Sequence, residues 1–272
     1  MLPASLSFSE ESASSAKWYQ IELMVFANSN EAEDHGEHWP TDLRLRYPAN
    51  TLALKPAVDI SLLNRTSVDT SVEPEAQPID KPVTYRDYPS FTLLPEEAHT
   101  LRDAANNILS QYQYRPLFHG AWQQPIESRE AATAIAIYGG EKFDNHYELE
   151  GHVLIAVERY LHIYTDLWLN RFIQAIGSDA FILQKLPTLP HQKTEALASV
   201  MSPLLTDNDR LTEGLTQPLY QVERTVVMRQ HRRMRSEELH YIDHPLFGLV
   251  IKITPIEIND SASDSQPQSD NN

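Results

Sequence analysis

The stretch ELEGHVLIAVERYLHIYTDLWLNRF, residues 148–172, carries the strongest structural signal in the chain. Two runs of alternating apolar and polar residues lie on either side of a short connection near Arg159. Successive side chains of a β-strand point to opposite faces of a sheet, so this pattern predicts a β-hairpin. One face of the hairpin is aliphatic. The opposite face carries Glu150, His152, Tyr160, His162, Tyr164 and Trp168.

The aliphatic face of the hairpin needs a covering element. The sequence LPEEAHTLRDAANNILSQY, residues 94–112, places apolar residues at three- and four-residue spacing, which is typical of an amphipathic helix. Pro95 suits the first helical position, and the two glutamates that follow it favour the positive end of a helix dipole. We therefore expect a helix of about five turns that packs against the aliphatic face of the hairpin.

Further runs of strand-forming residues surround these two elements. They occupy residues 17–27, 114–126, 132–138, 220–234 and 246–256, and the last of them is apolar enough to be central in a sheet. Strands and helices do not alternate along the chain. The sequence therefore predicts an α+β fold, in which a mostly antiparallel β-sheet carries one principal amphipathic helix on one face, together with long polar insertions.

Polar and proline-containing stretches set the expected domain limits. We expect a single domain over residues 17–256, with insertions at about 28–90 and 174–218 and a disordered acidic tail over residues 257–272. Residues 1–16 have no continuous apolar core and no basic residue before Lys17, so they do not form an intact signal peptide. They are either a disordered N-terminus or the remnant of a signal.

The composition excludes several classes of function. The formal net charge is −16, which argues against a nucleic-acid partner. The chain has no cysteine, so disulfides, thiolate catalysis and cysteine-based zinc sites are excluded. No apolar run is long enough to cross a membrane. The sequence also lacks the familiar hydrolase, metalloprotease and nucleotide-binding motifs, so we expect no enzyme activity and no cofactor.

Positive charge is nevertheless concentrated in one segment. Five arginines and no acidic residue lie between positions 224 and 235. Strand alternation places Arg229, Arg233 and Arg235 on one face and Arg224 and Arg232 on the other. Guanidinium groups bind carboxylates with two hydrogen bonds. The arginines of this segment therefore have two possible roles. The arginines either contact an anionic ligand or pair internally with Glu148, Glu150, Glu158 or Glu223.

Two other groups of polar residues are candidates for a site. The polar-aromatic face of the hairpin could stack on sugar rings, or an insertion could cover it and make it a second core. His240, Asp243 and His244 suggest a metal site, but on a strand the two imidazoles would lie about 13 Å apart. We expect them to form hydrogen bonds at a turn, and we predict no metal ligands.

Four segments resemble one family. KWYQIELMVFAN (17–28), YRPLFHGAWQQPI (114–126), ELEGHVLIAVERYLHIYTDLWL (148–169) and RRMRSEELHYIDHPLFGLVIKI (232–253) are similar, in this order, to the CsiV family of gammaproteobacterial peptidoglycan-binding, cell-shape-integrity proteins. The resemblance implies a periplasmic protein whose signal peptide has been removed. It also implies a role in peptidoglycan assembly, with a class A penicillin-binding protein and its outer-membrane lipoprotein activator as partners.

Together with this resemblance, the residues suggest a binding surface in which arginines meet the peptide carboxylates of peptidoglycan and aromatic side chains meet its glycan. The candidate ligand-binding residues are Arg229, Arg233, Arg235, Tyr160, His162, Tyr164, Trp168, Glu150 and His152, with Arg224, Arg232, His240 and His244 as secondary candidates. The alternative is a protein–protein adaptor of the envelope that does not bind the wall directly.

Overall fold

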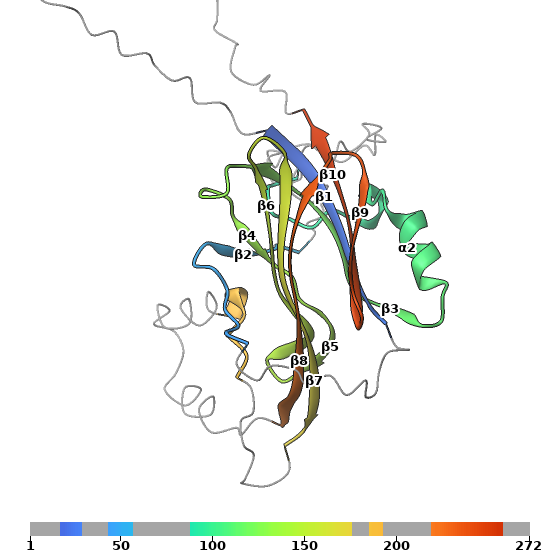
Figure 1. Cartoon of the computed structure of the whole chain (residues 1–272), viewed down its shortest axis with the longest axis vertical. Helices are drawn as coiled ribbons and strands as arrows, with labels where there is room; N and C mark the ends of the chain where they lie inside the picture. Colours follow the sequence, from blue (N-terminus) through green and yellow to red (C-terminus); the bar gives the residue numbers. More distant parts are fainter. Residues whose placement is uncertain (1–16, 29–42, 57–87, 176–184, 193–218, 258–272) are drawn as a thin grey trace, which may run out of the picture.

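Strand β1, Lys17–Asn28, lies inside the first of two β-sheets in the computed structural model (Figure 1). The structure describes residues 17–28, 43–56, 88–175, 185–192 and 219–257. In the first sheet, sheet A, the order is β3 (Tyr114–Ile126), β1, β10 (Phe247–Ile256) and β9 (Leu239–His244), and all neighbours are antiparallel. The predicted strands at both ends of the domain are confirmed, as is the central place of β10. Strand β9 was not predicted.

The second sheet, sheet B, is built around the predicted hairpin. Its order is β2 (Thr51–Ala53), β4 (Ala134–Ala136), β6 (His146–Val157), β7 (Leu161–Gln174) and β8 (Tyr220–Met234), and β5 (Gly139–Phe143) pairs with β6. Strands β2 and β4 are parallel, whereas the other neighbours are antiparallel. The mostly antiparallel character of the fold is therefore confirmed.

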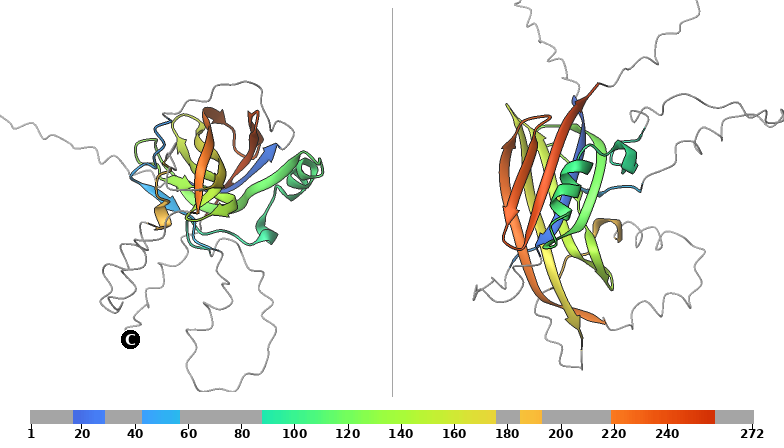
Figure 2. Two further views of the ribbon diagram at one scale, coloured as in Figure 1. Left: turned by 90° about the horizontal axis from the view of Figure 1, so that it is seen from below. Right: turned by 90° about the vertical axis from the view of Figure 1, so that its right-hand side faces the viewer.

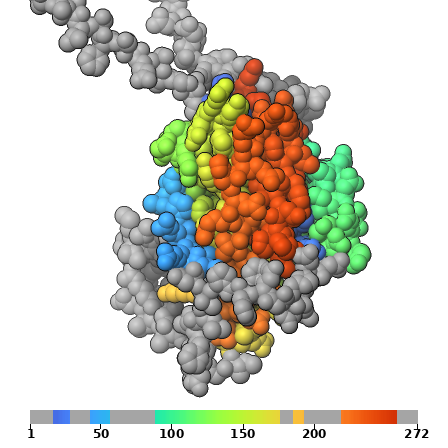
Figure 3. Space-filling model, viewed as in Figure 1, coloured from blue at the N-terminus to red at the C-terminus, as the bar shows by residue number. Residues whose placement is uncertain are grey.

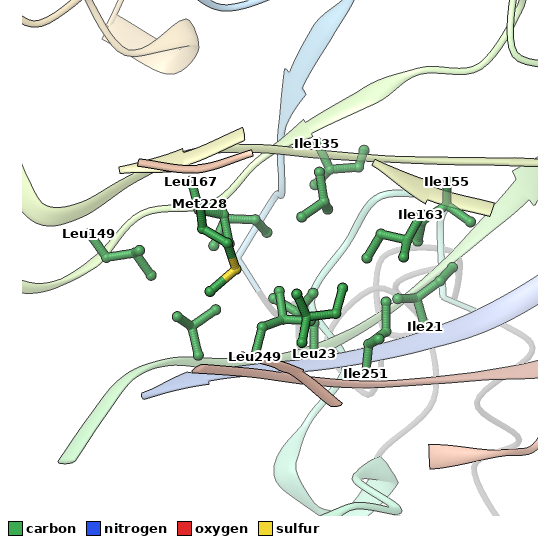
Figure 4. Packing of buried hydrophobic residues seen from close by; sticks show 14 of the residues in the cluster. Ile21, Leu23, Ile135, Leu149, Ile155, Ile163, Leu167, Met228, Leu249 and Ile251 are labelled. Carbon is green, nitrogen blue, oxygen red and sulfur yellow. The ribbon is translucent and has the colours of Figure 1, made fainter. Parts of the chain in front are cut away.

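The two sheets face each other and enclose the main core. Figure 4 shows Ile21, Leu23, Leu249 and Ile251 of sheet A opposite a row of residues from sheet B that includes Ile155. The prediction that the helix covers the aliphatic face of the hairpin is therefore wrong, because sheet A covers it. Two long strands offer a larger flat apolar surface than a short helix, so more apolar area leaves water in this arrangement.

The predicted helix is shorter than expected and lies elsewhere. A 3₁₀ turn, η2 (Glu96–Ala98), is followed by the eight-residue helix α2 (Arg102–Leu109), which lies on the outer face of sheet A (Figure 2). Leu101 and Ala105 pack there against Met24, Phe26 and Val250. The helical pattern breaks at His99–Thr100 because the carboxylate of Glu22 accepts the backbone N–H groups of Thr100 and Leu101.

The two sheets also meet along one edge. Gln230 Nε2 on β8 donates to the carbonyl of Asp243 on β9 at 2.9 Å, and an Arg232 guanidinium nitrogen donates to the carbonyl of Tyr241 at 2.6 Å. The orange and red surface of these strands is accordingly continuous in Figure 3. Arg232 therefore joins the two sheets, which gives it a structural role.

Parts of the predicted insertions belong to the described structure. Residues 43–56 include β2, and residues 88–94 contribute bridges and hydrogen bonds to the same body, for example Leu93 N–H to the carbonyl of Lys55. Residues 1–16, and all but the first residue of the predicted tail 257–272, lie outside the described residues. Within the described part of the chain, no helix is long and apolar enough to cross a membrane.

Candidate functional site

The outer face of sheet B carries most of the side chains that the sequence analysis selected. Strands β7 and β8 are paired so that His162 lies opposite Arg233, Tyr164 opposite His231, and Asp166 opposite Arg229. All six side chains are on the side of the sheet away from the core, because the intervening residues Ile163, Leu167 and Met228 face inward. The prediction that Arg229 and Arg233 share a face is confirmed.

One half of this outer face is covered. The ring of Tyr47 lies 5.0 Å from the ring of Trp168 and 6.1 Å from that of His152, and the Tyr47 hydroxyl accepts the backbone N–H of Gly151 at 3.3 Å. Trp168 and Glu150 are fully buried. This half therefore forms a second core under part of an insertion, which is the second of the two predicted alternatives. Trp168 and Glu150 are inaccessible to a polymer.

Burial also sets the charge state of the covered residues. Desolvation raises the pKa of Tyr47 far above its ordinary value, and the nearby carboxylate of Glu150 adds to this effect. Desolvation likewise lowers the pKa of His152, although Asp166 opposes the shift. Glu150 accepts the backbone N–H of Tyr147 at 2.8 Å and lies 3.0 Å from His146 Nδ1. The Glu150 carboxylate is therefore held by hydrogen bonds inside the covered half.

The other half of the face is open and carries a stack of rings. Tyr164 and His231 lie with their centroids 4.3 Å apart and an interplanar angle of 2°. His162 continues the stack, with its ring 5.1 Å from that of His231 and its Nδ1 2.9 Å from His231 Nε2. His162 and Tyr164 are half-buried, His231 is exposed, and Tyr160 nearby is 43% exposed. This half can therefore contact a flat, polar ligand.

Three arginines lie over the tyrosine rings of the open half. The guanidinium carbon of Arg129 is 4.3 Å from the centroid of Tyr164, that of Arg233 is 4.7 Å from Tyr160, and that of Arg159 is 5.6 Å from Tyr160. Among the described residues, none of these three arginines has a carboxylate within ion-pair distance. We call this group the Arg/Tyr surface, which consists of Arg129, Arg159, Tyr160, His162, Tyr164, His231 and Arg233.

The other predicted arginines are occupied or lie elsewhere. Arg229 forms two hydrogen bonds to the carboxylate of Asp166, at 2.9 and 3.2 Å. Arg235 pairs with Glu238 at 3.4 Å, just beyond the end of β8. Arg224 lines a separate cavity at the opposite end of the strand.

The internal pairing of Arg229 differs from the expected one. Of the predicted partners, Glu148 pairs with Arg115 and Glu223 pairs with Arg171, whereas Arg229 uses Asp166. The reason is register, because Asp166 is the direct cross-strand neighbour of Arg229.

A cavity adjoins the Arg/Tyr surface. It has a volume of about 770 Å³ and lies where the β6–β7 turn meets the ends of β1, β3 and β8. Arg159 and Tyr160 belong both to its wall and to the Arg/Tyr surface, so the two are continuous. Lys17 and Arg235 add positive charge to the wall, and Glu127 adds negative charge. This end of the sandwich can hold an anionic group.

The two histidines of β9 form the expected hydrogen bonds. His240 Nε2 lies 3.1 Å from the backbone nitrogen of Arg235, and His244 Nδ1 accepts the N–H of Leu246 at 3.3 Å. Both residues are on a strand, as the argument against a shared metal ion assumed. Neither lies on the Arg/Tyr surface.

The comparison with family models agrees with this description. The model of the family described as "Peptidoglycan-binding protein, CsiV" matches residues 1–256. The chain belongs to the CsiV family. No curated protein and no solved structure shows significant similarity to it. The CsiV match includes every strand of both sheets, so the covered and open halves of the outer face both belong to the family domain. The family is described by what it binds and not by a reaction.

Four residues of this CsiV domain were not among the candidates predicted from the sequence. His231 lies two residues from both Arg229 and Arg233, so alternation along β8 could have placed it on the same face. Arg129 lies in the connection between β3 and β4, where no periodicity operates, and Arg159 was considered only as part of the turn. Tyr47 lies in a segment that was expected to be an insertion.

Proposed function

We propose that this chain binds peptidoglycan directly, through the Arg/Tyr surface and the adjoining cavity. The observation that carries the proposal is the set of three arginines that lie over tyrosine rings without a carboxylate partner in the described structure. The description of the family as peptidoglycan-binding supports the choice of ligand.

The chemistry of the ligand matches this surface. Peptidoglycan is a sugar polymer that carries peptides with free carboxylates. A guanidinium group can form two charge-assisted hydrogen bonds with a carboxylate, whereas a cation–π contact at an exposed site contributes only about 0.5–1 kcal/mol. Arg129, Arg159 and Arg233 can therefore turn from the rings to the peptides, and Tyr160 and Tyr164 then offer their faces to the sugars.

The charge of the remaining molecule favours localised binding. The net charge is −16, and the bacterial wall is itself anionic, so most of the protein surface is repelled by the ligand. Attraction is confined to places where cations outnumber acids. This predicts binding that weakens as salt rises, because the arginine contacts are screened.

For the cellular role, we propose a non-catalytic periplasmic protein that supports peptidoglycan assembly and cell-shape integrity. It would do so by promoting the activity of a class A penicillin-binding protein through that enzyme's outer-membrane lipoprotein activator. This part of the proposal follows from the family resemblance of the sequence, and a wall-binding surface is compatible with it.

The test is co-sedimentation of the purified protein with isolated sacculi over a salt series. Wild type is compared with the triple variant R129Q/R159Q/R233Q and with the control variant R171Q. Arg171 is an exposed arginine that already pairs with Glu223 at 2.8 Å. Its replacement therefore removes the same charge per residue, but away from the Arg/Tyr surface. The supernatant is assayed for released muropeptides.

We expect wild type and R171Q to pellet at low salt, the triple variant to remain largely soluble, and no fragments to be released. Failure of wild type to pellet at any salt would overturn direct wall binding and favour the adaptor function. Released fragments would indicate an enzyme. Equal pelleting of the triple variant would show that another surface binds the wall.

A further inference from the structure

We propose that Glu22, His99 and His119 form a binding site for a zinc ion on the outer face of sheet A. Glu22 is on β1, His119 is on the neighbouring strand β3, and His99 lies between η2 and α2. One ligand atom from each residue lies within 4.8 Å of the other two. This group is separate from the Arg/Tyr surface, which is on sheet B.

The spacing of the three atoms suits a tetrahedral ion. Two ligand atoms that each lie about 2.0 Å from zinc at a tetrahedral angle are about 3.3 Å apart. Glu22 Oε1 lies 2.9 Å from His119 Nε2 and 3.9 Å from His99 Nδ1, on either side of that value. The rings of His99 and His119 are 4.6 Å apart. All three atoms lie within 4.8 Å of one another, so side-chain rotations that bring each pair to about 3.3 Å would place them around one ion.

The carboxylate of Glu22 is held in place for this role. Oε2 accepts the backbone N–H of Thr100 at 2.6 Å and its hydroxyl at 2.9 Å. The N–H of Leu101 lies between the two oxygens, at 3.1 and 3.0 Å. Oε1 is thus the oxygen that faces the two imidazoles, and the backbone contacts fix its direction. Such supporting hydrogen bonds are typical of metal-binding carboxylates.

The histidines are also prepared for coordination. The ring of His99 hydrogen-bonds to the backbone of Leu94, which is the kind of contact that fixes the tautomer of a metal-binding histidine. His99 Nδ1 and His119 Nε2 are the ring atoms nearest to Glu22 Oε1, so each ring presents one nitrogen toward the same carboxylate oxygen. A neutral imidazole offers the lone pair that an ion requires.

The site opens to a cavity that leaves room for a fourth ligand. The cavity has a volume of about 570 Å³, and both histidines, Glu96 and Arg102 contribute to its wall. Three protein ligands and one open position are the arrangement of zinc sites that exchange water or another ligand. Lys252 is the cross-strand neighbour of Glu22 on β10, and in the described structure it forms no ion pair with Glu22.

The ligand set selects the class of metal. Two imidazoles and one carboxylate suit zinc and its transition-metal neighbours, whereas magnesium and calcium require oxygen ligands. The site joins the helical segment to two strands of sheet A, so a bound ion would tie these elements together and stabilise the folded state.

The test uses the full chain after treatment with a chelator and removal of the chelator. Zinc chloride and, separately, magnesium chloride are titrated by calorimetry, and the melting temperature is measured with and without each ion. The variants are H99Q and H119Q. The control is H146Q, because His146 also lies beside a buried glutamate, 3.0 Å from Glu150 Oε1, but belongs to no three-residue group among the described residues.

We expect one zinc ion per chain, a higher melting temperature with zinc, and neither effect with magnesium. H99Q and H119Q should weaken zinc binding by roughly 100-fold or more, because even the loss of an outer hydrogen-bond partner costs about 10- to 100-fold. H146Q should bind zinc as wild type does. If H119Q does not fold, H99Q decides the question, since its contact with Glu22 at 3.9 Å is too long for a hydrogen bond. Zinc binding that survives in H99Q, or that is lost in H146Q instead, would overturn the proposal.

Discussion

The carboxylate of Glu22 on β1 caps the segment that enters α2, with Oε2 only 2.6 Å from the backbone nitrogen of Thr100. The two residues are far apart in the sequence, and the bond joins the outer face of sheet A to the segment that covers it. Glu22 is 1% exposed, so neighbouring groups rather than water must stabilise its charge. The hydrogen bonds that it accepts favour the ionised carboxylate.

The first prediction concerns acid stability. Burial alone would raise the pKa of Glu22, but the hydrogen bonds from His119, Thr100 and Leu101 outweigh it, so the pKa is below its ordinary value of 4.5. A lowered folded-state pKa contributes stability that is fully present above the unfolded-state value, and that is lost as pH falls through the folded-state value. E22Q should lower the free energy of unfolding by about 2 kcal/mol at pH 7, because hydrogen bonds to charged groups contribute about 1.5–3 kcal/mol.

The measurement for Glu22 is urea unfolding of the metal-free protein at several pH values. The free energy of unfolding of wild type should approach that of E22Q as the pH falls below 4.5, because the unfolded-state carboxylate binds its proton there. E96Q is the control, because Glu96 is exposed in η2. An E22Q variant whose stability relative to wild type does not change with pH would contradict the argument.

The second prediction concerns Arg229. Its guanidinium is 55% exposed and is already occupied by Asp166. Replacing it with glutamine should leave retention on sacculi unchanged, and should cost less than about 1 kcal/mol of stability because exposed ion pairs contribute little. R233Q at the same strand face is the comparison, and it should reduce retention. Equal losses for both variants in the sedimentation assay would show that the ion pair opens to meet the ligand.

The third prediction concerns Gly151 in the middle of β6. Its φ is +127°, and a Cβ atom there would lie 2.2 Å from the carbonyl oxygen of Asp166 on β7. G151A should therefore destabilise the domain by about 1–3 kcal/mol from backbone strain alone, and the clash adds to this cost. Thermal unfolding measures the effect. A156G on the same strand serves as the control, with an expected loss of roughly 0.5–1 kcal/mol. A G151A protein as stable as A156G would mean that β6 and β7 can separate locally at little cost.

Local periodicity was sufficient for the strands and insufficient for their arrangement. The alternation in residues 148–172 predicted the hairpin and its two faces, and β8 was predicted with its observed limits of Tyr220–Met234. The alternation of apolar and polar residues does not indicate whether a sheet or a helix covers an aliphatic face. A sheet and a helix satisfy the same pattern, so the sandwich could not be distinguished from a sheet with one helix.

The helix illustrates how a distant residue changes a local pattern. Residues 94–112 have the spacing of one continuous helix, but Glu22 binds the backbone at Thr100 and divides it. At the candidate site, alternation correctly placed Tyr160, His162 and Tyr164 on one face of the hairpin. It did not show that the strand of Arg233 is the neighbour of that hairpin. It could not show that Tyr47 covers Trp168, because that contact depends on a segment without periodicity.

The fourth prediction separates the two kinds of contact on the Arg/Tyr surface. Arginine–carboxylate contacts are screened by salt, whereas ring–sugar contacts depend on apolar area and persist. The variant Y160A/Y164A should reduce retention on sacculi at both low and high salt. R129Q/R159Q/R233Q should reduce it mainly at low salt, so that its retention depends less on salt than that of wild type. Both variants should show the same folded far-ultraviolet spectrum, because Tyr160 is 43% exposed, Tyr164 is half-buried outside the core and the arginines lie at the surface. If the tyrosine variant instead lost retention only at low salt, the rings would serve to position the arginines, and the glycan would have to be bound elsewhere.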